Sequence, residues 1–235
     1  GASKHRNENL NNKEIYYSNI QDLSNLLEII KKKPVRRIVF TSSLYVYGTQ
    51  AKSPYSEKST VTPDTVYGKS KHKGELSIQD FSEKNLIPST ILRLFFIYGP
   101  DQKTLNSNYD SLIHKTIKRL KQGKNPIVYG SGNQSMDFVF IDDLINFLYL
   151  CSERKTDLKG NYLLNFSSGK KFSVIEIIKL ISEIMKVDVK MNFNEADWTN
   201  RLSRYGSNDE LKKVFDIDSF TNLTDGINKC VKSYE

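Results

Sequence analysis

The sequence is poor in the features that mark disulfide-linked, metal-binding and membrane-spanning proteins. Its 235 residues include only two cysteines and three histidines. Cys151 and Cys230 lack metal-ligand spacing, so we expect two ordinary thiols in a reducing compartment and no metal site. No apolar run approaches the roughly 20 residues of a membrane-spanning helix, and no signal peptide is recognisable. We therefore expect a cytoplasmic protein without membrane contact.

Positive charge is in excess but is not concentrated. A net charge of +8 would suit nucleic acid, a membrane surface or an anionic small ligand, so its distribution decides among them. The lysines are scattered over several predicted helices, as in Lys31 to Lys33, Lys69 to Lys73 and Lys115 to Lys124. Solvated helix faces explain most of them. No nucleic-acid-binding motif with interleaved aromatics occurs, so we expect no nucleic-acid partner.

The first half of the sequence alternates helical and strand patterns. A helix, a buried strand, a loop, a helix and a second buried strand are predicted over residues 13–33, 37–40, 48–64, 65–83 and 90–96. Pro34 should end the first helix, and the first strand should deliver the hydroxyls of Thr41, Ser42 and Ser43 at its carboxyl end. Strand, helix, strand is a parallel crossover unit, so the predicted fold class is α/β.

The second half contains smaller and more mixed elements. Ser173 and Glu176 form a capping box that opens a helix, and Asp142 or Asp143 is expected to cap another. The remaining predictions are helices over 109–122 and 223–234, strands over 127–129, 137–141 and 162–166, and an extended segment over 187–193.

One stretch carries a recognisable chemistry. If Tyr67 begins a helix, Lys71 lies one turn further along the same face, so an ammonium can lie beneath a phenol. A fixed cation nearby favours the phenolate and should lower the tyrosine pKa from about 10 toward neutral pH, as a general acid or base requires. Hydroxyls at the carboxyl end of a strand are well placed for a ligand of an open α/β sheet. On spacing alone, however, an ordinary surface pair would be the better explanation.

Four motifs supply the missing context. They are TSSLYVYG at 41–48, VYGKSK at 66–71, LRLFFIYGP at 92–100 and YGSGNQSMDFVFIDDL at 129–144. In this order they resemble the extended short-chain dehydrogenase/reductase family, in its nucleotide-sugar epimerase and dehydratase branch. The resemblance implies the C-terminal half of a Rossmann domain, which holds NAD or NADP on a partial parallel sheet, over residues 1–105. It implies a smaller α+β domain for the nucleotide-sugar over 106–235, with some elements returning to the sheet.

Carried over position by position, the resemblance implies three groups of site residues. Tyr67 is the catalytic acid/base, Ser43 hydrogen-bonds the sugar hydroxyl and the tyrosine, and Lys71 completes the catalytic set. The cofactor-binding residues are Thr41, Ser42, Tyr67, Lys71, Leu94 and Phe95. The substrate-binding residues are Ser43, Tyr45, Phe96, Arg201 and Arg204, although a surface role suits either arginine about as well.

The sequence departs from the family pattern at several positions. Met136 stands where an arginine commonly meets the substrate diphosphate, and a thioether cannot replace that bidentate contact. Phe96 replaces a frequent asparagine. Leu44 and Tyr45 occupy positions where the water-eliminating members carry an acidic pair. The resemblance therefore favours an epimerase or a keto-sugar reductase over a 4,6-dehydratase.

The glycine-rich fingerprint that meets the cofactor pyrophosphate in the family does not occur in this sequence. We therefore expect a fragment of a longer enzyme, with poor NAD binding by itself and an unpaired strand edge. A second chain could supply the other half, or catalysis could be lost, which leaves a non-catalytic sugar-nucleotide-binding or interaction module as the alternative. A homodimer is a candidate assembly.

Overall fold

Helices and strands alternate along the chain, and the longest strands form one parallel sheet. The computed structural model describes residues 12–33, 35–100, 111–152, 160–195, 202–217 and 219–234. The central sheet has the order β1-β2-β7, and both neighbouring pairs are parallel. Its strands are β1 (Ile38–Ser43), β2 (Ser89–Leu94) and β7 (Tyr162–Phe166). The predicted α/β class with a parallel sheet is confirmed.

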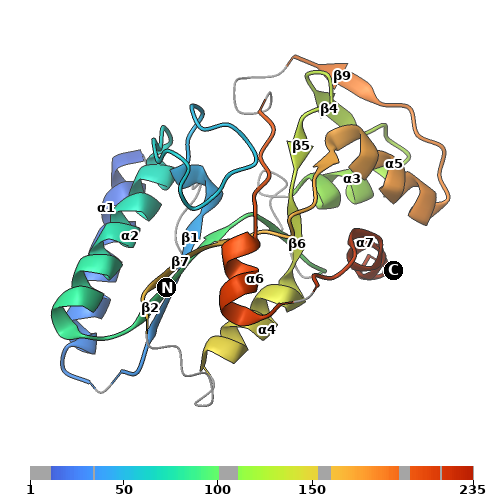
Figure 1. The fold of residues 1–235 in the computed structure, drawn as a ribbon. Coiled ribbons are helices and arrows are strands. Elements are labelled where there is room, and N and C mark those ends of the chain that lie inside the picture. Colours follow the sequence, from blue (N-terminus) through green and yellow to red (C-terminus); the bar gives the residue numbers. More distant parts are fainter. Residues whose placement is uncertain are drawn as a thin grey trace.

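Helices cover both faces of this sheet (Figure 1). On one face, α1 (Asn12–Ile30) packs beside α2 (Val66–Asn85). On the other face lie α4 (Ile141–Ser152) and α6 (Asp209–Phe215). The sheet is therefore the middle layer of three, as parallel sheets require for burial of both faces.

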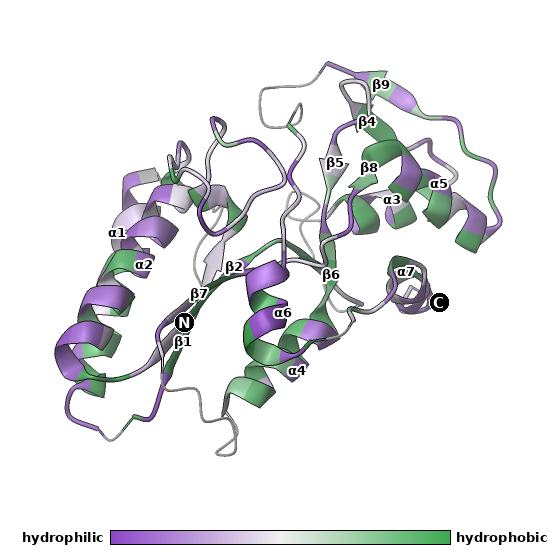
Figure 2. Cartoon of the chain, viewed as in Figure 1, coloured by the Kyte–Doolittle hydropathy of each residue, from purple (hydrophilic) through white to green (hydrophobic). Residues whose placement is uncertain are grey.

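The core follows from the alternation of side chains along β2. Ile91 points to the layer of α1 and α2, where it packs with Leu27, Ile78 and Phe81. Its neighbour Leu92 points to the opposite layer, where it packs with Phe147, Leu164 and Leu211. Figure 2 shows β6 in the hydrophobic colour, whereas α1 and α2 alternate between apolar and polar residues.

The remaining elements pack beyond one end of the sheet around a second apolar cluster. Tyr98, Ile117, Phe138, Ile177 and Ile227 are all buried in it. Three helices and three strand pairs surround it: α3 (Leu112–Lys121), α5 (Val174–Met185), α7 (Leu223–Lys232), β3 (Phe96–Tyr98) with β6 (Phe138–Phe140), β4 (Ile127–Tyr129) with β9 (Asn192–Asn194), and β5 (Ser135–Met136) with β8 (Phe172–Ser173). The boundary predicted between 105 and 106 stays a prediction.

The strand predicted over 90–96 is in fact two strands. The backbone N–H of Phe95 still donates to the carbonyl of Phe166 in β7, at 3.2 Å. The next N–H, of Phe96, donates instead to the carbonyl of Asp137, at 3.1 Å. The chain therefore leaves the central sheet at Phe95, and β3 pairs with β6. A continuous apolar run does not reveal such a change of partner.

Other boundaries differ in smaller ways. The first helix ends at Ile30, and Pro34 lies outside the described residues. Asp142 and Asp143 lie within the first turn of α4 and not ahead of it. The capping box of Ser173 and Glu176 is confirmed, but α6 was not predicted. Among the described residues, no helix is long and apolar enough to cross a membrane.

Among the described strands, β1 has an unpaired edge, as we expect for a sequence without the glycine-rich fingerprint segment. In the part of the chain that the structure describes, β1 pairs with β2 and no strand pairs with its other edge. Phe40 and Thr41 lie in this strand, so the open edge runs directly to the hydroxyls at its carboxyl end.

Candidate active site

The carboxyl end of β1 is closed by a single helical turn. Ser43 ends the strand in an extended conformation and caps η1 (Leu44–Val46), with its Oγ accepting from the backbone N–H of Tyr45 at 3.3 Å. Ser42 and Ser43 are both buried. The turn holds the Ser43 hydroxyl at the strand end, where ligands of open α/β sheets bind.

The N-terminus of α2 is packed tightly against this turn. Thr65 caps the helix by accepting from the backbone N–H of Gly68 at 3.0 Å. A Cβ on Gly68 would lie only 2.4 Å from the carbonyl oxygen of Tyr45. Only glycine allows so close an approach, and the approach places Tyr67 over η1. The rings of Tyr67 and Tyr45 meet edge to face, with centroids 6.0 Å apart.

The surroundings of Tyr67 correct the prediction about its proton. Burial raises the pKa of Tyr67, the hydrogen bond with the Ser43 side chain lowers it, and Tyr45 raises it further. The net direction is upward, so the predicted lowering by Lys71 is wrong for this state. The ammonium lies 5.7 Å from the Tyr67 ring centroid and donates its hydrogen bond elsewhere. The spacing of Tyr67 and Lys71 predicts that they share one face of the helix, but it does not show the burial that raises the pKa of Tyr67.

Lys71 is a buried cation at the same strand end. Its side chain is 6% exposed, and its Nζ donates to the carbonyl oxygen of Thr41 at 2.7 Å. Burial lowers the pKa of Lys71 to about 8, although the carboxylate of Glu75 acts in the opposite direction. The structure therefore brings Ser43, Tyr67 and Lys71 together, as the resemblance implies.

Glu75 is the residue that sequence reasoning missed. It lies one turn beyond Lys71 and is 2% exposed. Its carboxylate accepts from the Ser42 hydroxyl at 2.5 Å and from Nε and Nη2 of Arg93 at 2.9 and 2.8 Å. Burial disfavours the charge of Arg93, but Glu75 outweighs that effect and the pKa of Arg93 is raised. The repeat of Tyr67, Lys71 and Glu75 at four-residue intervals was the available signal.

Leu94 and Phe95, predicted to bind cofactor, lie at different depths. Leu94 ends β2 and pairs in register with Ser43, so it borders the catalytic group. Phe95 is 3% exposed and packs against Tyr55 and Gly206, where a Cβ on the glycine would approach the ring to 2.4 Å. Its side chain therefore presents almost no surface to a ligand.

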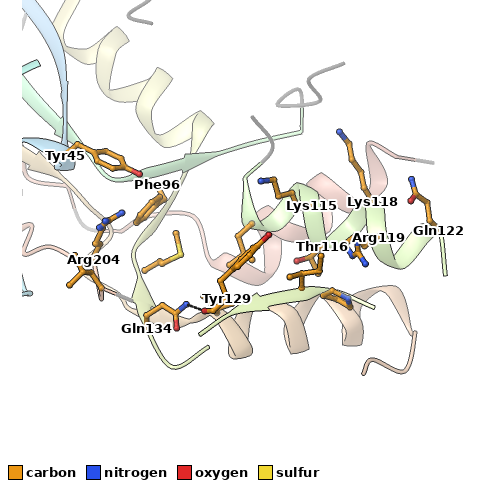
Figure 3. A pocket seen from close by; sticks show the side chains of 16 residues that line it. Tyr45, Phe96, Lys115, Thr116, Lys118, Arg119, Gln122, Tyr129, Gln134 and Arg204 are labelled. Carbon is orange, nitrogen blue, oxygen red and sulfur yellow. Dashed lines mark hydrogen bonds between the residues drawn. The ribbon is translucent and has the colours of Figure 1, made fainter. Parts of the chain in front are cut away.

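A pocket of about 570 Å³ opens beside the catalytic group. Three of the predicted substrate-binding residues, Tyr45, Phe96 and Arg204, line one end of it, as Figure 3 shows. The guanidinium of Arg204 lies 5.1 Å from the Tyr45 ring centroid. Arg201 lies outside the described residues. Side chains of α3 line the opposite part, among them Lys115, Thr116 and Arg119, which sequence reasoning did not single out.

Met136, which stands where the family resemblance implies an arginine, and its neighbour Asp137, which matches the aspartate that follows that arginine in the family, have separate roles. Met136 lines the pocket. Asp137 is buried and accepts hydrogen bonds from Ser167, Ser168 and Gly169 at 2.7 to 3.1 Å. Burial raises the pKa of Asp137, and these hydrogen bonds counter it. The carboxylate therefore fixes the turn after β7 and is not directed at a substrate.

Comparison with known proteins agrees with this geometry. The model of the NAD dependent epimerase/dehydratase family matches residues 1–167. The chain belongs to this family. An uncharacterised UDP-glucose epimerase from Bacillus subtilis is 29% identical over 209 residues, which cover 89% of this chain and 64% of that protein. The family member described here thus spans less than two thirds of the length of that relative.

Solved epimerases share the fold of this family member. A UDP-glucose 4-epimerase from Thermotoga maritima with UDP-glucose has a TM-score of 0.86 at 22% identity, over 95% of this chain and 71% of that chain. A UDP-glucuronic acid 4-epimerase from Bacillus cereus in complex with NAD has a TM-score of 0.78 at 26% identity, over 92% of this chain and 65% of that chain. The predicted membership of the nucleotide-sugar epimerase branch is confirmed.

Proposed function

We propose that this chain carries the catalytic and substrate-binding part of an NAD-dependent epimerase that inverts C4 of a UDP-linked sugar. The family and the similarity to UDP-glucose and UDP-glucuronic acid epimerases support it. The observation that carries it is the grouping of Ser43, Tyr67 and Lys71 beside a pocket that begins at Tyr45. Leu44 and Tyr45 in place of an acidic pair argue against elimination of water.

In this proposal Tyr67 moves the proton of the sugar 4-hydroxyl. Because burial raises its pKa, the phenol is protonated at neutral pH in this structure, so it must lose that proton before it can accept the 4-hydroxyl proton as hydride leaves C4, and it returns a proton when C4 is reduced. To act as a base it needs positive charge nearby, and the Lys71 ammonium is the cation within reach, 5.7 Å from the ring centroid. Ser43, hydrogen-bonded to Tyr67, orients the hydroxyl between them.

The residues present fit the nicotinamide-ribose end of NAD. Lys71 places an ammonium at the carboxyl end of β1, beside the Thr41 carbonyl, whereas the Ser42 hydroxyl donates to Glu75 and supports the site from below. When bound, NAD supplies the acceptor and donor of the hydride. The sequence contains no glycine-rich turn for the pyrophosphate, so we assign that contact to a segment outside this sequence. NAD, and not NADP, is proposed because the family and the Bacillus cereus complex name it.

Separate titrations test the two halves of the proposal. UDP-glucose and NADH would be titrated by calorimetry and fluorescence into this chain and into a form extended upstream to the length of its relatives. We expect both forms to bind UDP-glucose, and only the extended form to bind NADH tightly and to epimerise a UDP-sugar. If the extended form binds UDP-sugars but not NADH, the non-catalytic module is correct. If it acts on none of UDP-glucose, UDP-N-acetylglucosamine and UDP-glucuronate, the proposal fails.

Two expectations concern the whole protein and stay predictions. One is a homodimer, which sedimentation equilibrium of the chain would measure. The other is a cytoplasmic location, which fractionation of the cells that produce the protein would measure.

A further inference from the structure

The described residues that line the pocket beside the catalytic group carry positive charge and no negative charge. The 16 residues that line it include Lys115, Lys118, Arg119 and Arg204, and none of them is an aspartate or a glutamate. A concave site with charge of one sign concentrates ligands of the opposite sign. The lining therefore predicts an anionic ligand.

The apolar face of α3 determines which of its side chains reach the pocket. Ile113, Ile117 and Leu120 are buried in the cluster that α3 shares with α5 and α7. Helical periodicity then turns a neighbouring face toward the pocket, and the residues of α3 and its C-cap that line the pocket are Leu112, Lys115, Thr116, Lys118, Arg119 and Gln122. Figure 3 shows the Lys115 side chain extending from α3 toward the end of the pocket that Tyr45 and Phe96 mark.

The wall opposite α3 has a methionine where the family resemblance implies an arginine, and its one cationic side chain among the described residues is Arg204. Met136 lines the pocket where the family resemblance implies an arginine, and its thioether donates no hydrogen bond to a phosphate. Arg204 runs beside it, because its backbone N–H donates to the Ser135 carbonyl at 2.7 Å and its carbonyl accepts from the Asp137 N–H at 3.2 Å. The Arg204 side chain is 7% exposed and rests on the Tyr45 ring. This wall therefore offers one fixed guanidinium.

The cations of α3 are not equally available. The Nε of Arg119 donates to the carbonyl oxygen of Asn125 at 2.6 Å, so part of its donor set is committed to the chain before β4. Lys115 forms no ion pair with any carboxylate of the described residues, and its side chain points along the pocket. Lys115 is thus the cation on α3 best placed to meet a ligand that Arg204 contacts from the other side.

We propose that Lys115 on α3 takes over the diphosphate contact that the arginine-to-methionine exchange at Met136 removes, and that it acts with Arg204 across the pocket. The inference rests on the proposed function, because the diphosphate is that of a UDP-sugar. A diphosphate presents oxygens on both phosphorus atoms, so two cations on opposite walls can each take one charge-assisted hydrogen bond. In this proposal a residue of helix α3 contacts the diphosphate in place of a residue of strand β5.

Isothermal titration calorimetry with UDP and with uridine tests this placement. Lys115→Met keeps the aliphatic stem and removes the charge. We expect it to bind UDP at least about tenfold more weakly than the wild type, since a charge-assisted hydrogen bond is lost, and to bind uridine equally well. Unchanged uridine binding also shows that the variant is folded. The matched control is Lys124→Met, which removes an exposed charge beyond the end of α3 and should leave UDP affinity unchanged.

The double variant Lys115→Met/Met136→Arg tests whether an arginine at position 136 can replace Lys115 as the diphosphate contact. Returning an arginine to the strand should restore UDP affinity to within about threefold of the wild type. Equal UDP affinity of the wild type and Lys115→Met would overturn the inference and leave the proposed function intact. A double variant no tighter than Lys115→Met would refute the exchange. A wild-type chain that binds neither UDP nor uridine would overturn both proposals.

Discussion

The carboxylate of Glu75 accepts two hydrogen bonds from the guanidinium of Arg93, at 2.9 and 2.8 Å, and each residue is only 2% exposed. The same carboxylate accepts from Ser42 in β1 at 2.5 Å. Glu75 therefore joins α2 to both β1 and β2. With Lys71 bound to the Thr41 carbonyl, two successive turns of α2 are fixed to the strand that ends at the catalytic hydroxyls.

Removal of Glu75 should destabilise the protein severely. Glu75→Ala leaves the Arg93 guanidinium buried without its carboxylate, which should lower the free energy of unfolding by roughly 3–5 kcal/mol. Urea unfolding would measure the loss. The control is Asp80→Ala on the same helix, where the partner Lys84 is exposed and the loss should stay below about 1 kcal/mol. Equal losses in the two variants would show that the buried pair does not hold α2.

The buried ammonium of Lys71 should make stability rise with pH. Below about pH 8 both the folded and the unfolded protein carry the charge. Between about 8 and the usual 10.5, the folded protein has released the proton that the unfolded chain still binds, so the free energy of unfolding increases with pH. Lys71→Met should lose this increase, whereas Lys73→Met, which alters an exposed lysine of the same helix, should retain it. Unfolding curves at several pH values measure the difference, and parallel profiles of wild type and Lys71→Met would contradict the assignment.

Gly68 should tolerate no side chain. A methyl group 2.4 Å from the Tyr45 carbonyl forces α2 away from η1 and moves Tyr67 from Ser43. Gly68→Ala should therefore cost about 1–3 kcal/mol in the free energy of unfolding and lower turnover as well. Lys69→Ala, at the exposed neighbouring position, should change stability by no more than about 0.5 kcal/mol. Thermal unfolding distinguishes the two, and a stable, fully active Gly68→Ala would refute the packing argument.

The sequence was sufficient for the features that depend on neighbouring residues. The strand before Ser43, the helix that carries Tyr67 and Lys71, and the capping box at Ser173 were all predicted, because each is a pattern within one short segment. The four motifs added the family, which the comparison confirms. Local patterns of this kind are the part of folding that propensity and periodicity describe.

Features that join distant segments were missed or were wrong. The pair of Glu75 and Arg93 spans 18 residues, and the placement of Arg204 beside Met136 depends on a contact between segments 68 residues apart. Neither leaves a local pattern. The pKa of Tyr67 was predicted in the wrong direction because burial, which has the largest effect on it, is a property of the folded molecule. Lys115 is exposed, as the prediction of a solvated helix face requires, but the spacing of the lysines does not show that this face of α3 borders the pocket.

The measurement that tests the central claim most directly is turnover by Tyr67→Phe in the NAD-loaded, upstream-extended form. Epimerisation of a UDP-sugar that the wild type accepts would be followed by NMR, and UDP-glucose binding by calorimetry. Loss of the phenolic hydroxyl should lower kcat by about 10²- to 10⁴-fold and leave UDP-glucose affinity within about twofold of the wild type. A Tyr67→Phe enzyme with turnover within about threefold of the wild type would show that another group moves the proton.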